Sequence, residues 1–135
     1  KTGDDVALLA VGSMVNYSLK AAEKLANEGI NCEVINVRFI KPLDAEMLNY
    51  IAGKHSKIVT LEESTLIGGF GSAVLEYFNE KNFKNDILRI GLPDHFVEHG
   101  TQKELHRLLK MDPDSIVERV KIFCKNNIIK REISI

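Results

Sequence analysis

The chain lacks most of the features that would place it in a specialised class of protein. It has only two cysteines, Cys32 and Cys124, which are far apart and form no C-x-x-C pair, so a reduced cytoplasmic protein is expected. The formal net charge is −1, from 18 basic and 19 acidic side chains, which gives no reason to expect a nucleic-acid partner or an anionic membrane partner. No apolar run approaches the length of a membrane span, and no leader-like segment opens the sequence.

Common catalytic and phosphate-binding motifs are also missing. There is no Gly-x-Ser-x-Gly elbow for a serine nucleophile, and no Gly-Lys-Ser/Thr of a phosphate loop. Neither cysteine lies near a histidine in a way that suggests a nucleophile and its base. The residues by themselves therefore predict no catalytic, cofactor-binding or metal-binding site.

What is present is the composition of one ordinary globular domain. The 135 residues are 44% apolar and 27% charged, enough to bury a real core. The chain does not begin with methionine and runs almost at once from Lys1 into an apolar stretch. We therefore expect a piece of a longer polypeptide, or a processed one.

Apolar runs alternate with segments of helical periodicity along the whole chain. Strands are expected at 5–11, 32–37, 57–61 and 87–90, and helices at 15–28, after Asp44, from the glycines near residue 70 through Phe78, after Thr101, and after Asp112. This alternation predicts an α/β fold with a mostly parallel sheet covered by helices on both faces. Residues 1–126 are expected to form one domain, and the 127–135 tail an edge strand or a disordered end.

In such a sheet ligands bind at the carboxyl ends of the strands, where the strand order reverses. If the first strand is central, that crevice lies between Gly12-Ser13 and the turn from Glu62 to Gly71. Gly69 and Gly71 could expose backbone N–H groups to an anion, but Val74 stands where the dinucleotide fingerprint needs its third glycine. Close packing of a tight turn is therefore favoured over anion binding.

Two further motifs have a chemical and a structural interpretation. Glu62 and Glu63 are an acid pair, but neighbouring strand residues point to opposite faces, so we expect one of them to face solvent or cap the next turn. His95 to His99 spells H-x-x-E-H, a zinc-peptidase pattern. Pro93 and Gly100 leave it hardly one helical turn, so packing is favoured over metal binding.

The segment from Arg38 to Asp44 carries two cations at the end of the second strand. An arginine fork would suit phosphate oxygens, but ion pairs of Arg38 and Lys41 with Asp44 that fix the loop are favoured.

Four segments taken together resemble the C-terminal domain of the 1-deoxy-D-xylulose-5-phosphate synthases, which are transketolase-like thiamine diphosphate enzymes. The matching segments, in the family's order, are Arg38 to Asp44, Leu61 to Glu63 with Gly68 to Glu76, Gly91 to Thr101, and Asp112 to Val120. They cover nearly the whole chain to about Asn126. Transketolase and the pyruvate dehydrogenase beta subunit are the alternatives within the same superfamily, and a regulatory anion- or nucleotide-binding module is an alternative outside it.

The resemblance implies a domain that supports catalysis elsewhere in the polypeptide. The full-length enzyme condenses pyruvate with glyceraldehyde 3-phosphate and releases carbon dioxide, using thiamine diphosphate and Mg²⁺ held by a Gly-Asp-Gly…Asn motif in the preceding domains. This chain lacks that motif, so it is expected to hold no cofactor and to be inactive alone, with those catalytic domains and a homodimer partner as its contacts.

The resemblance also implies a three-layer α/β/α fold, an antiparallel edge strand upstream of Lys1, and an interface or crevice at the glycine turn. The residues expected there are Glu63, Gly68, Gly69, Phe70, Gly71 and His99. Phe70 is accordingly expected to be more exposed than core residues such as Leu8 and Val59. The 128–135 tail is expected to cover the edge that the upstream strand would otherwise occupy.

Overall fold

The computed structural model describes residues 1–95 and 99–133, with side chains as far as residue 126. Its strands are β1 (Val6–Ala10), β2 (Cys32–Asn36), β3 (Lys57–Thr65) and β4 (Asp86–Leu92). Its helices are α1 (Met14–Asn27), α2 (Ala45–Lys54), α3 (Phe70–Glu80), α4 (Gln102–Leu108) and α5 (Pro113–Ile133). None of these helices, within the described part of the chain, combines the length and apolar character that a membrane span requires.

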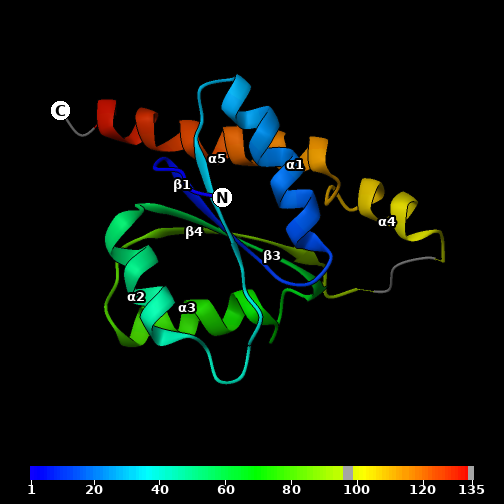
Figure 1. The fold of residues 1–135 in the computed structure, drawn as a ribbon, viewed down its shortest axis with the longest axis horizontal. Helices are drawn as coiled ribbons and strands as arrows, with labels where there is room; N and C mark the ends of the chain where they lie inside the picture. Colours follow the sequence, from blue (N-terminus) through cyan, green and yellow to red (C-terminus); the bar gives the residue numbers. More distant parts are fainter. Residues whose placement is uncertain (96–98, 134–135) are drawn as a thin grey trace.

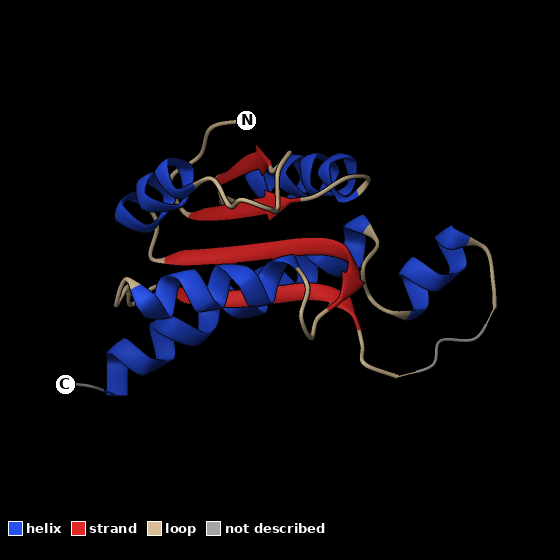
Figure 2. Cartoon of the chain, turned by 90° about the horizontal axis from the view of Figure 1, so that it is seen from below, coloured by secondary structure: helices blue, strands red, loops and turns tan. Residues whose placement is uncertain are grey.

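The strands of the described residues form one parallel sheet in the order β2-β1-β3-β4. Helices α1 and α5 pack on one face, and α2 and α3 on the other (Figures 1 and 2). β1 is buried along its whole length, and alternate residues of the strand enter opposite cores. Leu8 lies in the core beneath α1 and α5, whereas Leu9 lies in the core beneath α2 and α3. The three-layer α/β/α prediction is confirmed.

The helix boundaries follow local signals that the sequence carries. Asp44 caps α2 by accepting a hydrogen bond from the Met47 N–H at 3.0 Å. Thr101 and Glu104 form the predicted capping box at the start of α4. Gly29 follows α1 with φ of +84°, a conformation that glycine adopts without strain.

The predicted edge strand in the tail is wrong. Residues 127–133 continue α5, so the helix runs past the expected domain end at 126 without a break (Figure 1). Residues 134–135 lie outside the described part. No glycine or proline follows Pro113, so nothing in the sequence ends the helix early.

The outer edge of β2 is met by the first residue of the chain. The Val34 N–H donates to the Lys1 carbonyl oxygen at 2.9 Å, and the Lys1 amino group donates to the Val34 carbonyl oxygen at 3.3 Å. Such a reciprocal pair is the hydrogen-bond pattern of antiparallel strands. The Lys1 backbone therefore runs antiparallel to β2 at this point.

Candidate functional site at the carboxyl end of the sheet

The predicted crevice lies at the point where the strand order reverses. From β1 the chain moves outward to β2 and then returns to the other side of β1 for β3, so the reversal falls between β1 and β3. At their carboxyl ends the Ser13 hydroxyl donates a hydrogen bond to the Glu63 carboxylate. The two segments named from the sequence are therefore in contact.

Glu62 closes the glycine turn from inside the protein. Its side chain is buried, and its two carboxylate oxygens accept the N–H groups of Phe70 at 2.7 Å and Gly71 at 2.9 Å. The Ser64 hydroxyl donates to the same carboxylate. The anion at the start of α3 is thus the protein's own side chain, which is favourable against the helix dipole. The prediction that one acid of the pair caps the next turn is confirmed. Because the Phe70 and Gly71 N–H groups donate to Glu62, they are not available to bind an external anion.

The glycines of this turn allow close packing, as the favoured interpretation predicted. A Cβ on Gly69 would overlap the Thr65 carbonyl oxygen and the Glu62 carboxylate. A Cβ on Gly71 would lie 2.6 Å from the Thr60 hydroxyl oxygen. Gly68 has open space but a φ of +74°, which other residues rarely adopt.

The turn is also fixed from β4. The guanidinium of Arg89 donates to the Leu66 carbonyl oxygen at 2.8 Å and to the Ser72 hydroxyl at 3.0 Å. The Ser72 hydroxyl in turn donates to the same Leu66 carbonyl at 2.6 Å. Hydrogen bonds to Glu62 of β3 and from Arg89 of β4 therefore both fix the turn.

The expected exposure of Phe70 is wrong. Its side chain is 1% exposed and packs in the core between the sheet and the layer of α2 and α3, together with Val74 and Phe78. Phe70 is the first residue of α3, and the hydrogen bond from its N–H to Glu62 fixes the helix start against the sheet. The exposed apolar residue of the turn is instead Ile67.

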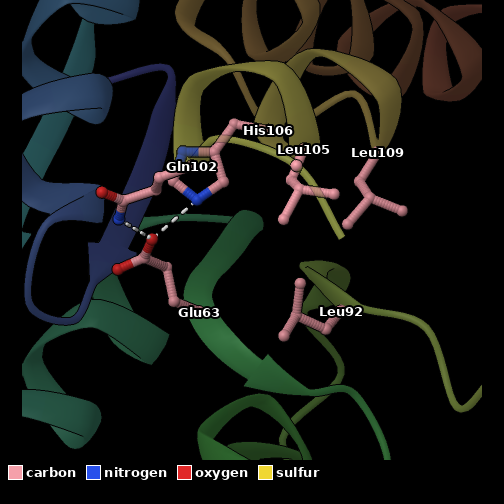
Figure 3. A pocket seen from close by; sticks show the side chains of 7 residues that line it. Glu63, Leu92, Gln102, Leu105, His106 and Leu109 are labelled. Atoms are coloured by element: carbon pink, nitrogen blue, oxygen red, sulfur yellow. Dashed lines mark hydrogen bonds and ion pairs between the residues drawn. The ribbon is translucent and has the colours of Figure 1, made fainter. Parts of the chain in front are cut away.

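Glu63 faces away from Glu62 and joins three elements. Its carboxylate accepts a hydrogen bond from Ser13, before α1. It also accepts one from the Gln102 amide of α4 at 2.6 Å and pairs with the His106 imidazole at 2.6 Å (Figure 3). The other ring nitrogen of His106 lies 3.2 Å from the Tyr17 hydroxyl. Burial alone would raise the pKa of Glu63, but the hydrogen bonds from Ser13 and Gln102 and the neighbouring His106 outweigh it and hold the pKa below its usual range.

A cavity of about 330 Å³ opens beside this carboxylate. Figure 3 shows Glu63, Gln102 and His106 on one side of it, and Leu92, Leu105 and Leu109 on the other. Gln102 and His106 were not predicted as site residues from the sequence. The signal was available: the capping box at Thr101 predicts a helix, and residues four apart share a helix face.

His99, the remaining predicted site residue, is exposed, and the middle of its H-x-x-E-H motif lies outside the described residues. Among the residues that the structure describes, no group of three or more histidine, cysteine, aspartate or glutamate side chains could hold a metal ion. The Phe70 and Gly71 N–H groups are bonded to Glu62 and are therefore not available to a diphosphate at this turn.

The expected ion pairs in the segment from Arg38 to Asp44 are wrong for the described part of the chain. Asp44 is used as the cap of α2, and no ion pair or hydrogen bond to a described residue involves the Arg38 guanidinium or the Lys41 ammonium. Both side chains are exposed. Because α2 begins at Ala45, the Asp44 carboxylate turns toward the helix N–H groups instead of the two cations.

Comparison with known proteins agrees with this architecture. The family model described as "Transketolase, C-terminal domain" matches residues 1–116. The chain is 44% identical over 119 residues to the 1-deoxy-D-xylulose-5-phosphate synthase of Cytophaga hutchinsonii, and 43% identical over 119 residues to that of Aquifex aeolicus. Each match covers 88% of this chain but only 19% of the relative, so the chain spans about a fifth of those relatives' length.

Among solved structures, the chain is similar to a protein titled "Split gene transketolase, inactive beta4 tetramer". The TM-score is 0.83 and the sequence identity 35%, with 90% of this chain and 39% of that one covered. The family model covers well over half of the chain, and the fold agrees with it. The chain therefore belongs to the transketolase C-terminal domain family.

Proposed function

We propose that this chain is the C-terminal accessory domain of a 1-deoxy-D-xylulose-5-phosphate synthase. The observation that carries the proposal is the 43–44% identity to two such synthases across 88% of this chain. The split-gene transketolase is less similar, at 35%, which favours the synthase over transketolase. In the proposed full-length enzyme, thiamine diphosphate and Mg²⁺ are held by the preceding domains, and the chemistry on pyruvate and glyceraldehyde 3-phosphate takes place there.

The domain's part in this enzyme is structural: it contacts the catalytic domains, contributes to a homodimer, and catalyses nothing alone. The two free thiols of Cys32 and Cys124 support a cytoplasmic site, since reducing compartments keep thiols unpaired. The alternative of an anion- or nucleotide-binding module is disfavoured, because Glu62 already bonds the N–H groups of the glycine turn.

A chimera tests the proposal. The Aquifex aeolicus synthase would be expressed with its C-terminal fifth replaced by this chain, and formation of 1-deoxy-D-xylulose 5-phosphate would be measured. We expect an active chimera, an inactive truncated synthase, and no turnover of pyruvate by this chain alone. A folded chimera without activity, or turnover by the isolated chain, would overturn the proposal.

A further inference from the structure

Because Phe70 is buried in the core, its side chain cannot contact a neighbouring domain. Another aromatic side chain is exposed at the same end of the sheet. Phe39, in the segment that follows β2, is 70% exposed, and its neighbour Ile40 is 37% exposed. Because β2 and β3 both run parallel to β1, the carboxyl ends of the two strands lie at the same end of the sheet. A large apolar side chain in water costs free energy that contact with a partner would recover.

Charge surrounds these two apolar side chains. Arg38 precedes them and Lys41 follows them, both exposed and without an ion pair or hydrogen bond to any described residue. The nearest acid in sequence, Asp44, is bonded to the Met47 N–H of α2. The segment therefore presents two unpaired cations on either side of an apolar pair. We refer to residues 38–41 as the Arg38–Lys41 loop.

A hollow lies beside this loop. It has a volume of about 270 Å³, and its lining includes Val37, Phe39, Asp44 and Met47. An apolar side chain entering the hollow would meet Phe39 and Met47. Carboxylates flanking that side chain would meet Arg38 and Lys41. The loop thus matches a surface that combines an apolar anchor with acidic neighbours.

We propose that the Arg38–Lys41 loop is the docking surface through which this domain binds the rest of the synthase polypeptide, at an acidic patch around an apolar side chain. The inference rests on the proposed function and gives that function its contact residues. The comparison with the relatives indicates what binds the loop. This chain spans 19% of their length, so in the proposed full-length enzyme about four-fifths of the polypeptide could contact the loop. The glycine turn is fixed internally by Glu62 and Arg89, and its role as an interface stays a separate prediction.

The test uses the chimera described above, with Phe39→Ser and the double variant Arg38→Glu/Lys41→Glu. Leu108→Ser is the matched apolar control, because Leu108 on α4 is also 70% exposed. Lys20→Glu on α1 is the charge control, because Lys20 is exposed and has no hydrogen bond or ion pair with a described residue. Each variant would first be made in the isolated chain, where unchanged thermal unfolding shows that the domain still folds.

In the chimera, we expect Phe39→Ser and the double variant to lower activity about tenfold, which is the order of effect when one interface anchor is truncated. We also expect the single thermal transition to split into two as the domain undocks. The two controls should behave as wild type. Wild-type behaviour of both loop variants in an active chimera would overturn this inference alone, whereas a folded, inactive wild-type chimera would overturn the proposed function and this inference with it.

Two other ligands of the Arg38–Lys41 loop, a second copy of this chain and a small anion, could be detected with the isolated chain. A dimer by light scattering that Phe39→Ser dissociates would assign the loop to a second copy of this chain. Heat on titration with inorganic phosphate that the double variant abolishes would assign it to a small anion. Either result would overturn the proposal, which predicts that Phe39→Ser leaves the oligomeric state of the isolated chain unchanged and that phosphate produces no heat.

Discussion

Two segments at the same end of the sheet differ in whether their polar groups are hydrogen-bonded within the domain. The turn after β3 bonds its polar groups within the molecule: Glu62 accepts the Phe70 and Gly71 N–H groups, and Arg89 donates to the Leu66 carbonyl. The loop after β2 leaves Arg38 and Lys41 without partners among the described residues and exposes Phe39. The first segment contributes to the stability of the domain alone, and the second has a role that requires another surface.

Among the polar residues of the two segments, the largest expected effect is at Glu62. Glu62→Ala removes a buried carboxylate that accepts two backbone N–H groups, so we expect unfolding free energy to fall by about 4 kcal/mol in urea denaturation. The matched control is the neighbouring Glu63→Ala, with an expected loss of about 1 kcal/mol because Glu63 is partly exposed. Equal losses at the two glutamates would mean that Glu62 is not the residue that closes the turn.

The next effect tests whether the turn tolerates a side chain. In Gly69→Ala, the added methyl group would overlap the Thr65 carbonyl oxygen, and we expect a loss of about 2 to 3 kcal/mol. Gly53→Ala in α2 is the control: apart from its chain neighbours and the nearby backbone of its own helix, no heavy atom lies within 4 Å of its Cβ position, so a small gain is expected from the better helix former. Thermal unfolding of both variants checks this, and a neutral Gly69→Ala would show that the turn is looser than described.

Acid should weaken the contact of α4 with the strand end. The pKa of Glu63 is held below its ordinary value, so the carboxylate stabilises the fold above that value, and this stabilisation is lost as pH falls through the lowered pKa. Glu63→Gln should therefore flatten the decline in unfolding free energy between pH 5 and pH 2 by up to about 1 kcal/mol. Glu33 and Asp112, whose pKa values are also lowered, keep part of the decline. An unchanged pH profile would contradict the role of Glu63.

The smallest effect on the stability of the isolated chain is expected in the Arg38–Lys41 loop. Because Phe39 is mostly exposed, Phe39→Ser should change the unfolding free energy of the isolated chain by less than about 0.5 kcal/mol. Phe70→Ala, in the core, should cost about 3 to 5 kcal/mol in the same assay. A large loss at Phe39 would show that the loop is packed within the domain, against its proposed role as a docking surface.

Local patterns in the sequence predicted the order of strands and helices well. The capping residues Asp44 and Thr101 marked two helix starts, and apolar runs marked all four strands. β3 was expected to end at Leu61 but continues to Thr65, because after a register irregularity it pairs again with Leu92 of β4. Such pairing is a long-range contact that the polar residues from Glu62 onward do not reveal.

The positions of the site residues were harder to predict from the sequence than the order of strands and helices, because they depend on tertiary structure. The opposite orientation of Glu62 and Glu63 follows from strand geometry and was predicted. The inward orientation of Phe70 was not, because it depends on the core that α2 and α3 form with the sheet. The approach of Gln102 and His106 to Glu63 likewise brings together residues about forty positions apart, at a distance that no local pattern encodes.

Hydrogen–deuterium exchange would test the contrast between these two segments most directly. Amide exchange would be compared between the isolated chain and the same chain joined to the rest of the synthase. We predict that the amides of Phe39, Ile40 and Lys41 exchange fast in isolation and slow on joining, while those of Phe70 and Gly71 are slow in both because Glu62 already bonds them. Protection gained at Phe70 and Gly71, with none at the Arg38–Lys41 loop, would contradict the account.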